Sequence, residues 1–421
     1  MVASPNTGGW LTAKRLRVHG SILVVCLWSL YVWNLATPGQ RDRGGNLKGT
    51  DFLHFYTLGL LADAHEGADL YNMNAQSALA GRHVPSALGI RYLPLYPPQV
   101  SLFFAPLAHL SYGLALVLWW GCCAGMYVIC CYRVWLACAN LRDSGGTVII
   151  LALGFPAFFH LIAWGQTSAL ALVCFTLMFF LLRDKREFLA GIALGCLIFK
   201  PQLGLAAAVL FVSLGAWRIV GGAIASASAQ LLVGVLYYGM EPLRRWLHML
   251  WNLGNVLPLL EPKPYQTHSL RTFWSMLIPW HGMAFGLYVL SAICVLWLTI
   301  SVWRDPSKPL SLRYSSLLLA TVLVAPHLTV YDLVILAPAI LLLADWLVGQ
   351  PVRSTQTIGT LLYMVYALPL IGPFARWTHV QLSVVAMAVL TYAIWNLSSR
   401  PAPEFSAAES RSAETASLKK S

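Results

Sequence analysis

Hydrophobic runs recur along almost the whole chain, separated by short polar breaks. They lie at residues 17–36, 112–138, 147–163, 167–182, 188–199, 201–216, 220–240, 283–303, 313–326, 330–348, 355–370 and 379–397. The runs are of helical span, whereas an outer-membrane barrel would show segments of about ten residues with alternating polarity. The pattern predicts an all-α polytopic membrane protein with about twelve transmembrane helices.

Two apolar segments need a separate interpretation. Residues 17–36 follow the basic stretch 14–17 and so resemble a secretory signal. Signal peptides have shorter apolar cores and a bundle follows here, so we expect a retained first helix. The run at 96–110 is short and contains Pro106, which predicts a re-entrant or interfacial helix in the first long loop.

Basic residues orient the predicted bundle. If the twelve runs all cross, 17 of the 28 Lys and Arg lie on the side of the amino terminus. Positively charged loops stay in the cytoplasm, so both termini are expected there, in a bacterial-type plasma (inner) membrane. The loops 37–111 and 241–282 then lie on the extracytoplasmic side. Residues 1–397 form one polytopic domain, and 398–421, rich in Ala, Ser and Glu, form a disordered cytoplasmic tail.

The composition also indicates a membrane protein, and the motifs that are absent exclude several kinds of enzyme chemistry. The 421 residues are 58% hydrophobic and 10% charged, and a soluble domain has about a quarter of its residues charged. The net charge of +12 comes from short clusters between apolar runs, so no nucleic-acid partner is expected. Patterns for ATP or nicotinamide binding and for hydrolase chemistry are absent. Asp63 and Glu66 do not form a DxD pair, so we expect no cofactor and find little support for a divalent metal.

Asp51 is the first polar residue of interest, in the stretch GNLKGTDFLHFY after the first run. Thr50 or Asp51 could cap a short interfacial helix over residues 52–62, because a side-chain oxygen satisfies free backbone N–H groups. Alternatively, Asp51 and His54 share one otherwise apolar face of that helix. An acid and a histidine on such a face near a bilayer indicate a functional site.

Other candidate residues lie in the breaks. Lys200 precedes Pro201; a lysine there can snorkel to the headgroups, but the break also frees backbone groups that could hold an anion. The loop at 264–271 carries Gln266, His268 and Arg271 beside aromatic residues. It is either a solvated loop or a site. Arg271 is the better phosphate ligand, because a guanidinium binds phosphate in a bidentate fork and lysine acts as a point charge.

Two further breaks carry polar side chains. The break at 325–332 contains His327 and, five positions later, Asp332. A lone histidine is usually structural, but an acid in the same helix break favours a site. The break at 164–167 contains Gln166, where a tight turn is the simpler interpretation.

Several short motifs occur in order along the chain: Asp51-Phe52 with Tyr56, Asp69-Leu70-Tyr71, Tyr96-Pro97-Pro98, Gly165-Gln166, Lys200-Pro201, His268-Ser269-Leu270-Arg271 and Pro326-His327. Together they resemble glycosyltransferase family 87, the polyprenyl-phosphate-mannose-dependent mannosyltransferases, over about residues 15–397. The resemblance implies C-type glycosyltransferase (GT-C) architecture, with an extracytoplasmic cavity and a lipid-linked sugar donor. Two residues inserted before Ser269 set this chain apart from the family's usual string.

The resemblance also implies roles for single residues. Asp51 and His327 take the catalytic positions, and Lys200 and Arg271 lie near the donor phosphate. The substrate-binding set is completed by Gln166, His268, His54, Gln266 and Tyr96.

The predicted function is a membrane glycosyltransferase. It moves a hexose from a polyprenyl-phosphate donor to a hydroxyl of a glycolipid or polysaccharide on the extracytoplasmic side. Mannose is the expected hexose. Only one well-placed carboxylate is evident, which favours an inverting single displacement. The alternative is a transporter or a lipid or glycan flippase, which also places charges in helix breaks. Polar residues at the outer ends only, without a clear repeat, favour the enzyme.

Overall fold

The computed structural model describes residues 11–254, 261, 263–350 and 352–398. The described residues form helices. Their β-type hydrogen bonding consists of two isolated bridges, between Arg41 and Leu47 and between Thr267 and Thr329. The predicted tail lies outside the described residues from position 399 onward.

Each predicted run is helical. The first half forms α1 (Ala13–Leu35), α2 (Phe52–Asp63), α3 (Met73–His83), α4 (Gln99–Ala108), α5 (Tyr112–Ala137), α6 (Gly145–Leu153), α7 (Pro156–Trp164), α8 (Ser168–Arg183), α9 (Glu187–Gly195) and α10 (Leu205–Ser213). The second half forms α11 (Trp217–Tyr238), α12 (Met240–Trp251), α14 (Leu270–Leu277), α15 (His281–Arg304), α16 (Leu310–Val324), α17 (Ala337–Val348), α18 (Val352–Ala367), α19 (Ala375–Thr378) and α20 (Leu382–Ser398). Short 3-10 helices join them, of which η1 (Gly67–Tyr71), η4 (Cys196–Phe199), η5 (Pro201–Leu203), η6 (Pro264–Gln266), η7 (Val330–Leu336) and η8 (Leu368–Phe374) border the polar breaks. The helices α3, α12, α14 and α19 form in segments that were predicted to be loops.

Several of these helices are long and apolar enough to cross a membrane. Among the described residues there are six, at Ala13–Leu35, Tyr112–Ala137, Trp217–Tyr238, His281–Arg304, Val330–Val348 and Gln356–Thr378. The helices α6 and α7, bent by 46° at their junction, make a seventh if they form one span. Five other apolar helices are shorter. The chain is thus a multi-pass membrane protein, and the expected twelve crossings remain a prediction.

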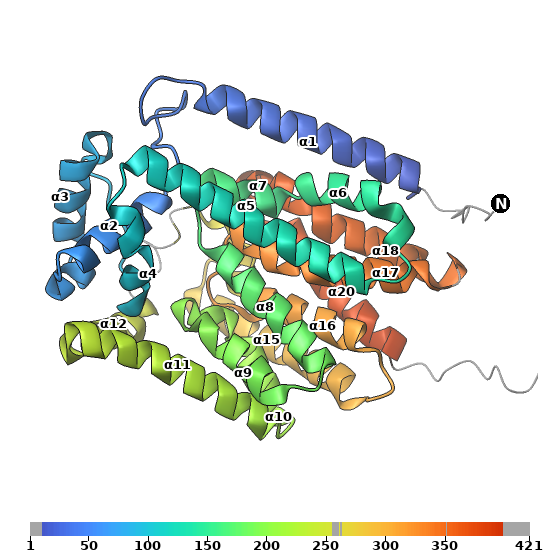
Figure 1. Cartoon of the computed structure of the whole chain (residues 1–421). Helices are drawn as coiled ribbons and strands as arrows, with labels where there is room; N and C mark the ends of the chain where they lie inside the picture. Colours follow the sequence, from blue (N-terminus) through green and yellow to red (C-terminus); the bar gives the residue numbers. More distant parts are fainter. Residues whose placement is uncertain (1–10, 255–260, 262, 351, 399–421) are drawn as a thin grey trace, which may run out of the picture.

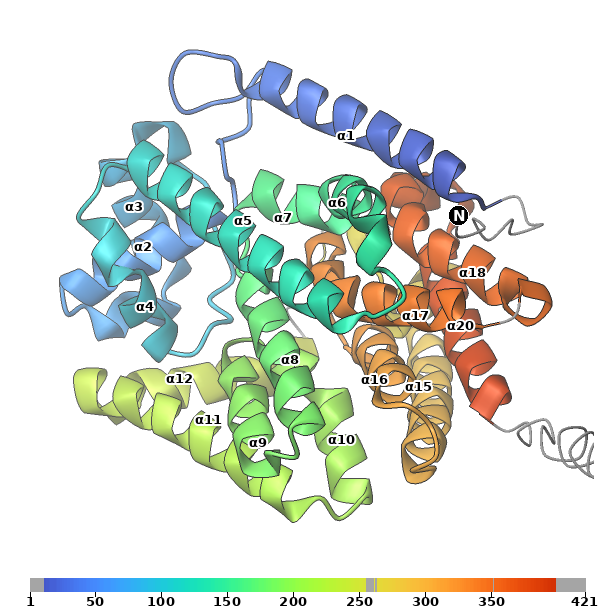
Figure 2. The same cartoon turned by 45° about the vertical axis from the view of Figure 1, so that its right-hand side comes forward.

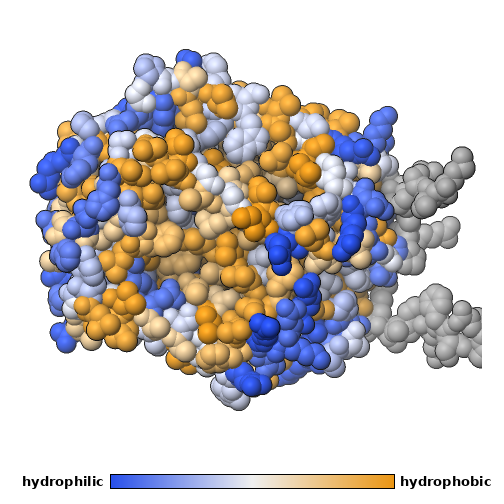
Figure 3. Space-filling model, in the orientation of Figure 1, coloured by the Kyte–Doolittle hydropathy of each residue, from blue (hydrophilic) through white to orange (hydrophobic). Residues whose placement is uncertain are grey.

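The arrangement separates two polar ends from an apolar middle. The helices α2, α3, α4 and α12 gather at one end, on the left of Figure 1, while the described ends of the chain lie on the other side. The same separation is visible in the rotated view of Figure 2. Figure 3 shows hydrophobic side chains over the middle of this face and hydrophilic ones towards both ends. This distribution suits a bundle embedded in a bilayer.

The first long loop contains short helices, as expected, but α2 differs from the prediction. We expected an interfacial helix on which Asp51 and His54 share an otherwise apolar face, whereas every residue from Phe52 to Ala62 is buried. It lies against α4, and a Cβ at Gly59 would come within 2.5 Å of the Phe104 carbonyl oxygen. The helix α4 has ten residues and is therefore about 15 Å long, half the thickness of a hydrocarbon core.

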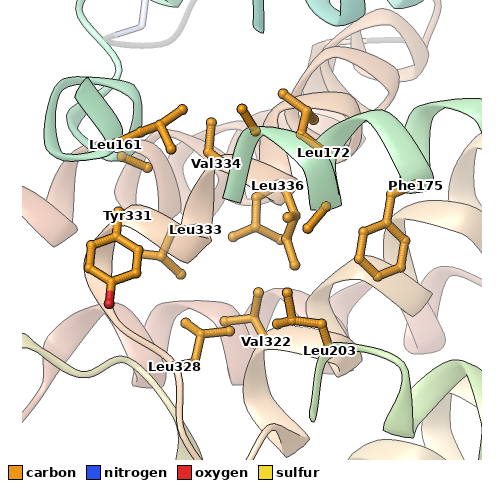
Figure 4. Close-up of a cluster of buried hydrophobic side chains, with 14 of the residues drawn as sticks. Leu161, Leu172, Phe175, Leu203, Val322, Leu328, Tyr331, Leu333, Val334 and Leu336 are labelled. Atoms are coloured by element: carbon orange, nitrogen blue, oxygen red, sulfur yellow. The ribbon is translucent and has the colours of Figure 1, made fainter. Parts of the chain in front are cut away.

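An apolar core supports the break that precedes α17. Figure 4 shows Leu333 and Val334 of η7 near Leu161 of α7 and Leu172 of α8, with the ring of Tyr331 beside Leu333. All of these side chains are buried. The packing fixes the backbone of η7, and with it the polar side chains at its start.

Candidate active site

Breaks that are far apart in the sequence meet beside α2. The Asp51 backbone N–H donates to the Trp164 carbonyl oxygen at 3.0 Å, which joins the first loop to the break between α7 and α8. Lys200, between η4 and η5, contacts Asp332 at the start of η7. The polar residues of four separate segments are thereby brought to one place.

Asp51 occupies the position before α2, but its side chain does not cap the helix. Its backbone is helical, with φ −76° and ψ −21°, and no side-chain capping hydrogen bond forms. Instead, Gln166 Nε2 donates to Asp51 Oδ2 at 2.6 Å. Of the two interpretations of Asp51, the structure therefore does not support the cap, and a role in a functional site stays a prediction.

The environment of Asp51 makes it a stronger base than an ordinary carboxylate. Burial raises the pKa of Asp51 to about 6, although the hydrogen bond from Gln166 and the charge of Lys200 favour the ionised form. The residue as a whole remains partly exposed. A carboxylate with a pKa close to neutrality that can still be reached from outside suits general-base chemistry.

The break at 164–167 is central to the site and more than a tight turn. Gly165 ends α7 in the left-handed region, with φ +69°, and a Cβ there would lie 2.7 Å from Phe52 Cβ. Trp119 Nε1 donates to the Gly165 carbonyl oxygen at 2.9 Å. Only glycine avoids both the strained φ and the contact with Phe52. This geometry aims Gln166 at Asp51.

Lys200 is enclosed by acceptors. Its Nζ lies 2.8 Å from Asp332 Oδ1, 3.0 Å from Ser168 Oγ and 3.4 Å from Gln166 Oε1. The Lys200 and Asp332 side chains are 5% and 3% exposed. Burial disfavours the charge, but Asp332 outweighs it, so the pKa of Lys200 lies above its ordinary value. The anion that occupies the break at Pro201 is thus the carboxylate of Asp332.

Asp332 is held on both sides. Its Oδ1 also accepts a hydrogen bond from Ser168 Oγ at 2.5 Å, and its Oδ2 accepts from the Thr329 backbone N–H and hydroxyl, each at 3.2 Å. From the sequence, Asp332 was of interest only because it lies in the same helix break as His327. The Thr-x-x-Asp spacing of a capping box was a usable clue that Asp332 starts a helical turn.

A second polar cluster forms around Glu261. His327 Nδ1 lies 2.7 Å from Glu261 Oε1, and Arg271 Nη2 forms an ion pair with Glu261 Oε2. Arg271 Nε also donates to the Pro326 carbonyl oxygen. Burial raises the pKa of Glu261, but His327 and Arg271 outweigh this effect and hold the pKa below its ordinary value. Sequence reasoning missed Glu261, because a single acid in a loop carries no pattern.

The break at 325–332 joins the two clusters, since it supplies His327 to one and Asp332 to the other. The loop at 264–271 runs along it through the β-bridge between Thr267 and Thr329. The His268 backbone N–H donates to the Leu328 carbonyl oxygen at 2.9 Å. The structure therefore brings Arg271 and His327 together, as a set separate from Asp51 and Lys200.

Two predicted residues adjoin the Asp51 cluster. The Tyr96 hydroxyl lies 3.5 Å from Gln166 Oε1, at the limit of a hydrogen bond. The His54 ring lies 5.2 Å from the Tyr92 ring and 5.7 Å from the Tyr96 ring, centroid to centroid. Both His54 nitrogens are buried without a hydrogen-bond partner in the described structure. Burial lowers the pKa of His54 to about 4, so the imidazole is neutral.

Two others lie outside both clusters. His268 is buried, and its Nδ1 lies 2.7 Å from Ser383 Oγ. Burial lowers the pKa of His268 to about 3, so its imidazole is neutral, and its role in substrate binding stays a prediction. Gln266 lies in η6, and its side chain makes no hydrogen bond to the described residues. Within the described part of the chain, no group of three or more His, Cys, Asp or Glu residues is arranged to hold a metal ion.

The helical bundle is a polytopic membrane protein that brings two polar clusters together beside α2 and around Glu261. The chain belongs to glycosyltransferase family 87: the family model matches residues 95–326, more than half of its length. The match includes Gln166, Lys200 and Arg271 and leaves Asp51 and His327 outside its bounds. The protein is therefore a membrane glycosyltransferase. Searches of curated proteins and of solved structures give no match.

Proposed function

We propose that the protein transfers a hexose, mannose in the first place, from a polyprenyl-phosphate donor to a hydroxyl of a glycolipid or polysaccharide acceptor. The donor's isoprenoid tail would lie in the bilayer and its phosphosugar at the extracytoplasmic surface. The distribution of Lys and Arg supports that side. Membership of the family supports the glycosyl transfer itself.

The observation that carries the mechanism is the state of Asp51. Asp332 and Glu261 are both held in ion pairs, whereas Asp51 is partly exposed and meets a neutral amide. Asp51 accepts the proton of the acceptor hydroxyl while the hydroxyl oxygen bonds to the anomeric carbon. The bond from that carbon to the phosphate oxygen breaks, and polyprenyl phosphate leaves. One free carboxylate suits a single displacement with inversion, because retention by double displacement needs a second carboxylate as nucleophile.

The number of N–H groups still free to donate a hydrogen bond distinguishes Lys200 from Arg271. An ammonium has three N–H groups, and those of Lys200 are taken by Asp332, Ser168 and Gln166. A guanidinium has five, and the described residues take two of those of Arg271. Arg271 is therefore the better candidate to stabilise charge on the departing phosphate, with His327 beside it. Lys200 instead holds Gln166 and Asp332 in place, which refines the expectation that both cations contact the phosphate.

The function is tested with purified protein in liposomes. Polyprenyl-phosphate mannose with a labelled sugar is supplied with a panel of glycolipid and polysaccharide acceptors, next to the Asp51→Asn variant. We expect label in an acceptor with the wild type and none with the variant. Movement of the intact donor across the bilayer without transfer would contradict the proposal and favour a flippase.

A further inference from the structure

A groove lined mainly by residues that carry polar groups lies at the end of the molecule that contains α2, α3 and α4. It has a volume of about 520 Å³, within the range of small-molecule sites, and opens along α12. Six of its seven lining residues carry polar groups: Tyr71, Glu241, Arg244, Arg245, His248 and Asn252, with Met249 as the seventh. Neither the family match nor the predicted site assigns a role to these residues.

The helix α12 divides into three faces at helical spacing. One is buried and includes Trp246, whose Nε1 donates to the Leu95 carbonyl oxygen at 2.9 Å. A second is apolar and exposed, with Leu247 at 53% and Trp251 at 89%. The third carries most of the polar residues of the groove, and Arg244 lies at its border with the apolar face, three positions before Leu247 and seven before Trp251. An exposed apolar face with an aromatic residue suits lipid at the membrane surface, so the polar face is the one that meets water-soluble groups.

The groove adjoins the proposed catalytic cluster through Tyr71. The same tyrosine lines the groove and a narrow crevice whose walls include His54 and Tyr96. Its hydroxyl donates to the Tyr96 carbonyl oxygen at 2.9 Å, and the Tyr96 hydroxyl faces Gln166, the partner of Asp51. Tyr71, Tyr96 and Gln166 therefore form a continuous series of side chains between the groove and the proposed base.

The polar side chains of the groove are partly fixed and partly available. Arg245 Nε lies 2.9 Å from Glu241 Oε1, and its Nη1 donates to the Ala68 carbonyl oxygen at 2.9 Å. This arrangement holds α12 against η1. Arg244 and His248 are exposed on the same side of the groove, and Asn252 Nδ2 lies 3.1 Å from His248 Nε2. Their donors, together with Glu241 and the Tyr71 ring, offer the planar hydrogen bonding and ring contact that a sugar can use.

We propose that this groove binds the saccharide part of the acceptor that is remote from the reacting hydroxyl. The proposal rests on the proposed function, since it supplies the acceptor subsite of the same reaction. Binding energy from a remote part of a substrate can hold the reacting group in position. The groove would thereby select an acceptor that already carries several sugar residues over a single sugar.

The test uses mannotetraose as the probe and the full chain in nanodiscs. The dissociation constant is measured by calorimetry for wild type, Arg244→Ala, His248→Ala and Asp51→Asn. Arg218→Ala is the matched control, because Arg218 is exposed on α11 at the far end from α12. Donor and acceptor KM values are measured in parallel.

We expect each groove substitution to weaken mannotetraose binding about fivefold, the value of one hydrogen bond, and to raise the acceptor KM with little change in donor KM. The Arg218→Ala and Asp51→Asn variants should bind like the wild type. No binding by the wild type, or equal binding by the groove variants, would overturn the proposal. A rise in donor KM alone would assign the groove to a lipid phosphate and would also overturn it. Asp51→Asn separates the two hypotheses, because binding can be read even if no transfer occurs.

Discussion

Replacing Asp51 by asparagine should stabilise the protein while removing its proposed activity. Asparagine keeps the size of the side chain and an oxygen that can accept the hydrogen bond from Gln166, but it has no charge. The wild-type carboxylate is costly to ionise in the folded protein, because burial raises the pKa of Asp51 from 3.8 to about 6. The substitution removes that cost.

The size and sign of this change in the free energy of unfolding follow from the linkage between protonation and folding. A shift of about two pKa units corresponds to about 3 kcal/mol, and the partial exposure of Asp51 reduces this to about 2 kcal/mol. Because the folded-state pKa is raised, the folded protein binds more protons than the unfolded chain between about pH 4 and pH 6. The free energy of unfolding therefore falls as pH rises through that window. The stabilisation by asparagine is full above it and absent below it.

Thermal unfolding of the two proteins in detergent, at about pH 4 and about pH 7.5, measures this effect. We expect Asp51→Asn to raise Tm by a few degrees at the higher pH and by nothing at the lower. Asp143→Asn is the matched control, because Asp143 is exposed in the turn before α6 and its substitution should leave Tm unchanged. A lower Tm for Asp51→Asn at about pH 7.5, or an equal gain at both pH values, would refute the burial argument.

Three further substitutions probe the same network. Gln166→Leu removes a hydrogen bond that favours the Asp51 carboxylate, so the pKa in the pH profile of kcat/KM should rise above about 6; an unchanged profile would contradict this. Lys200→Met leaves the Asp332 carboxylate buried without its ion-pair partner and should lower the free energy of unfolding by about 3 to 5 kcal/mol. The Lys200→Met/Asp332→Asn double variant should recover part of that loss. If chemical denaturation shows that the losses from the two substitutions simply add, the ion pair does not stabilise the fold. Gly165→Ala should destabilise by about 2 kcal/mol or more and reduce transfer, since φ is +69° and the added Cβ meets Phe52; wild-type Tm and activity would contradict it.

The hydrophobic pattern predicted the helices well, because apolar runs of helical length leave few alternatives in a membrane. All twelve runs correspond to helical segments, and 96–110 forms the short α4. The pattern predicted α2 less well. We expected an interfacial helix there, but the segment FLHFYTLGLLA is apolar on nearly every side, which is typical of a fully buried helix.

Some residues of the two polar clusters were candidates from the sequence, but the pairing of their side chains could not be predicted. Asp51, Gln166 and Lys200 were all candidates, and the structure unites them. The ion pair of Lys200 with Asp332 joins residues 132 positions apart, so it depends on how distant breaks pack together. Glu261 was missed because no local motif surrounds it, and it stands out only through its contacts with Arg271 and His327. His268 shows the opposite case, since a histidine in a polar loop is buried beside Ser383.

The pH dependence of kcat/KM for sugar transfer tests the role of Asp51 as the base most directly. For the wild type with polyprenyl-phosphate mannose, the account predicts a rise with pH and a midpoint near the Asp51 pKa of about 6. Asp51→Asn should be slower by about 10³-fold or more and should lack that midpoint. The same midpoint in the variant, or a loss of less than about tenfold, would contradict the account, because the proton would then be accepted by another group.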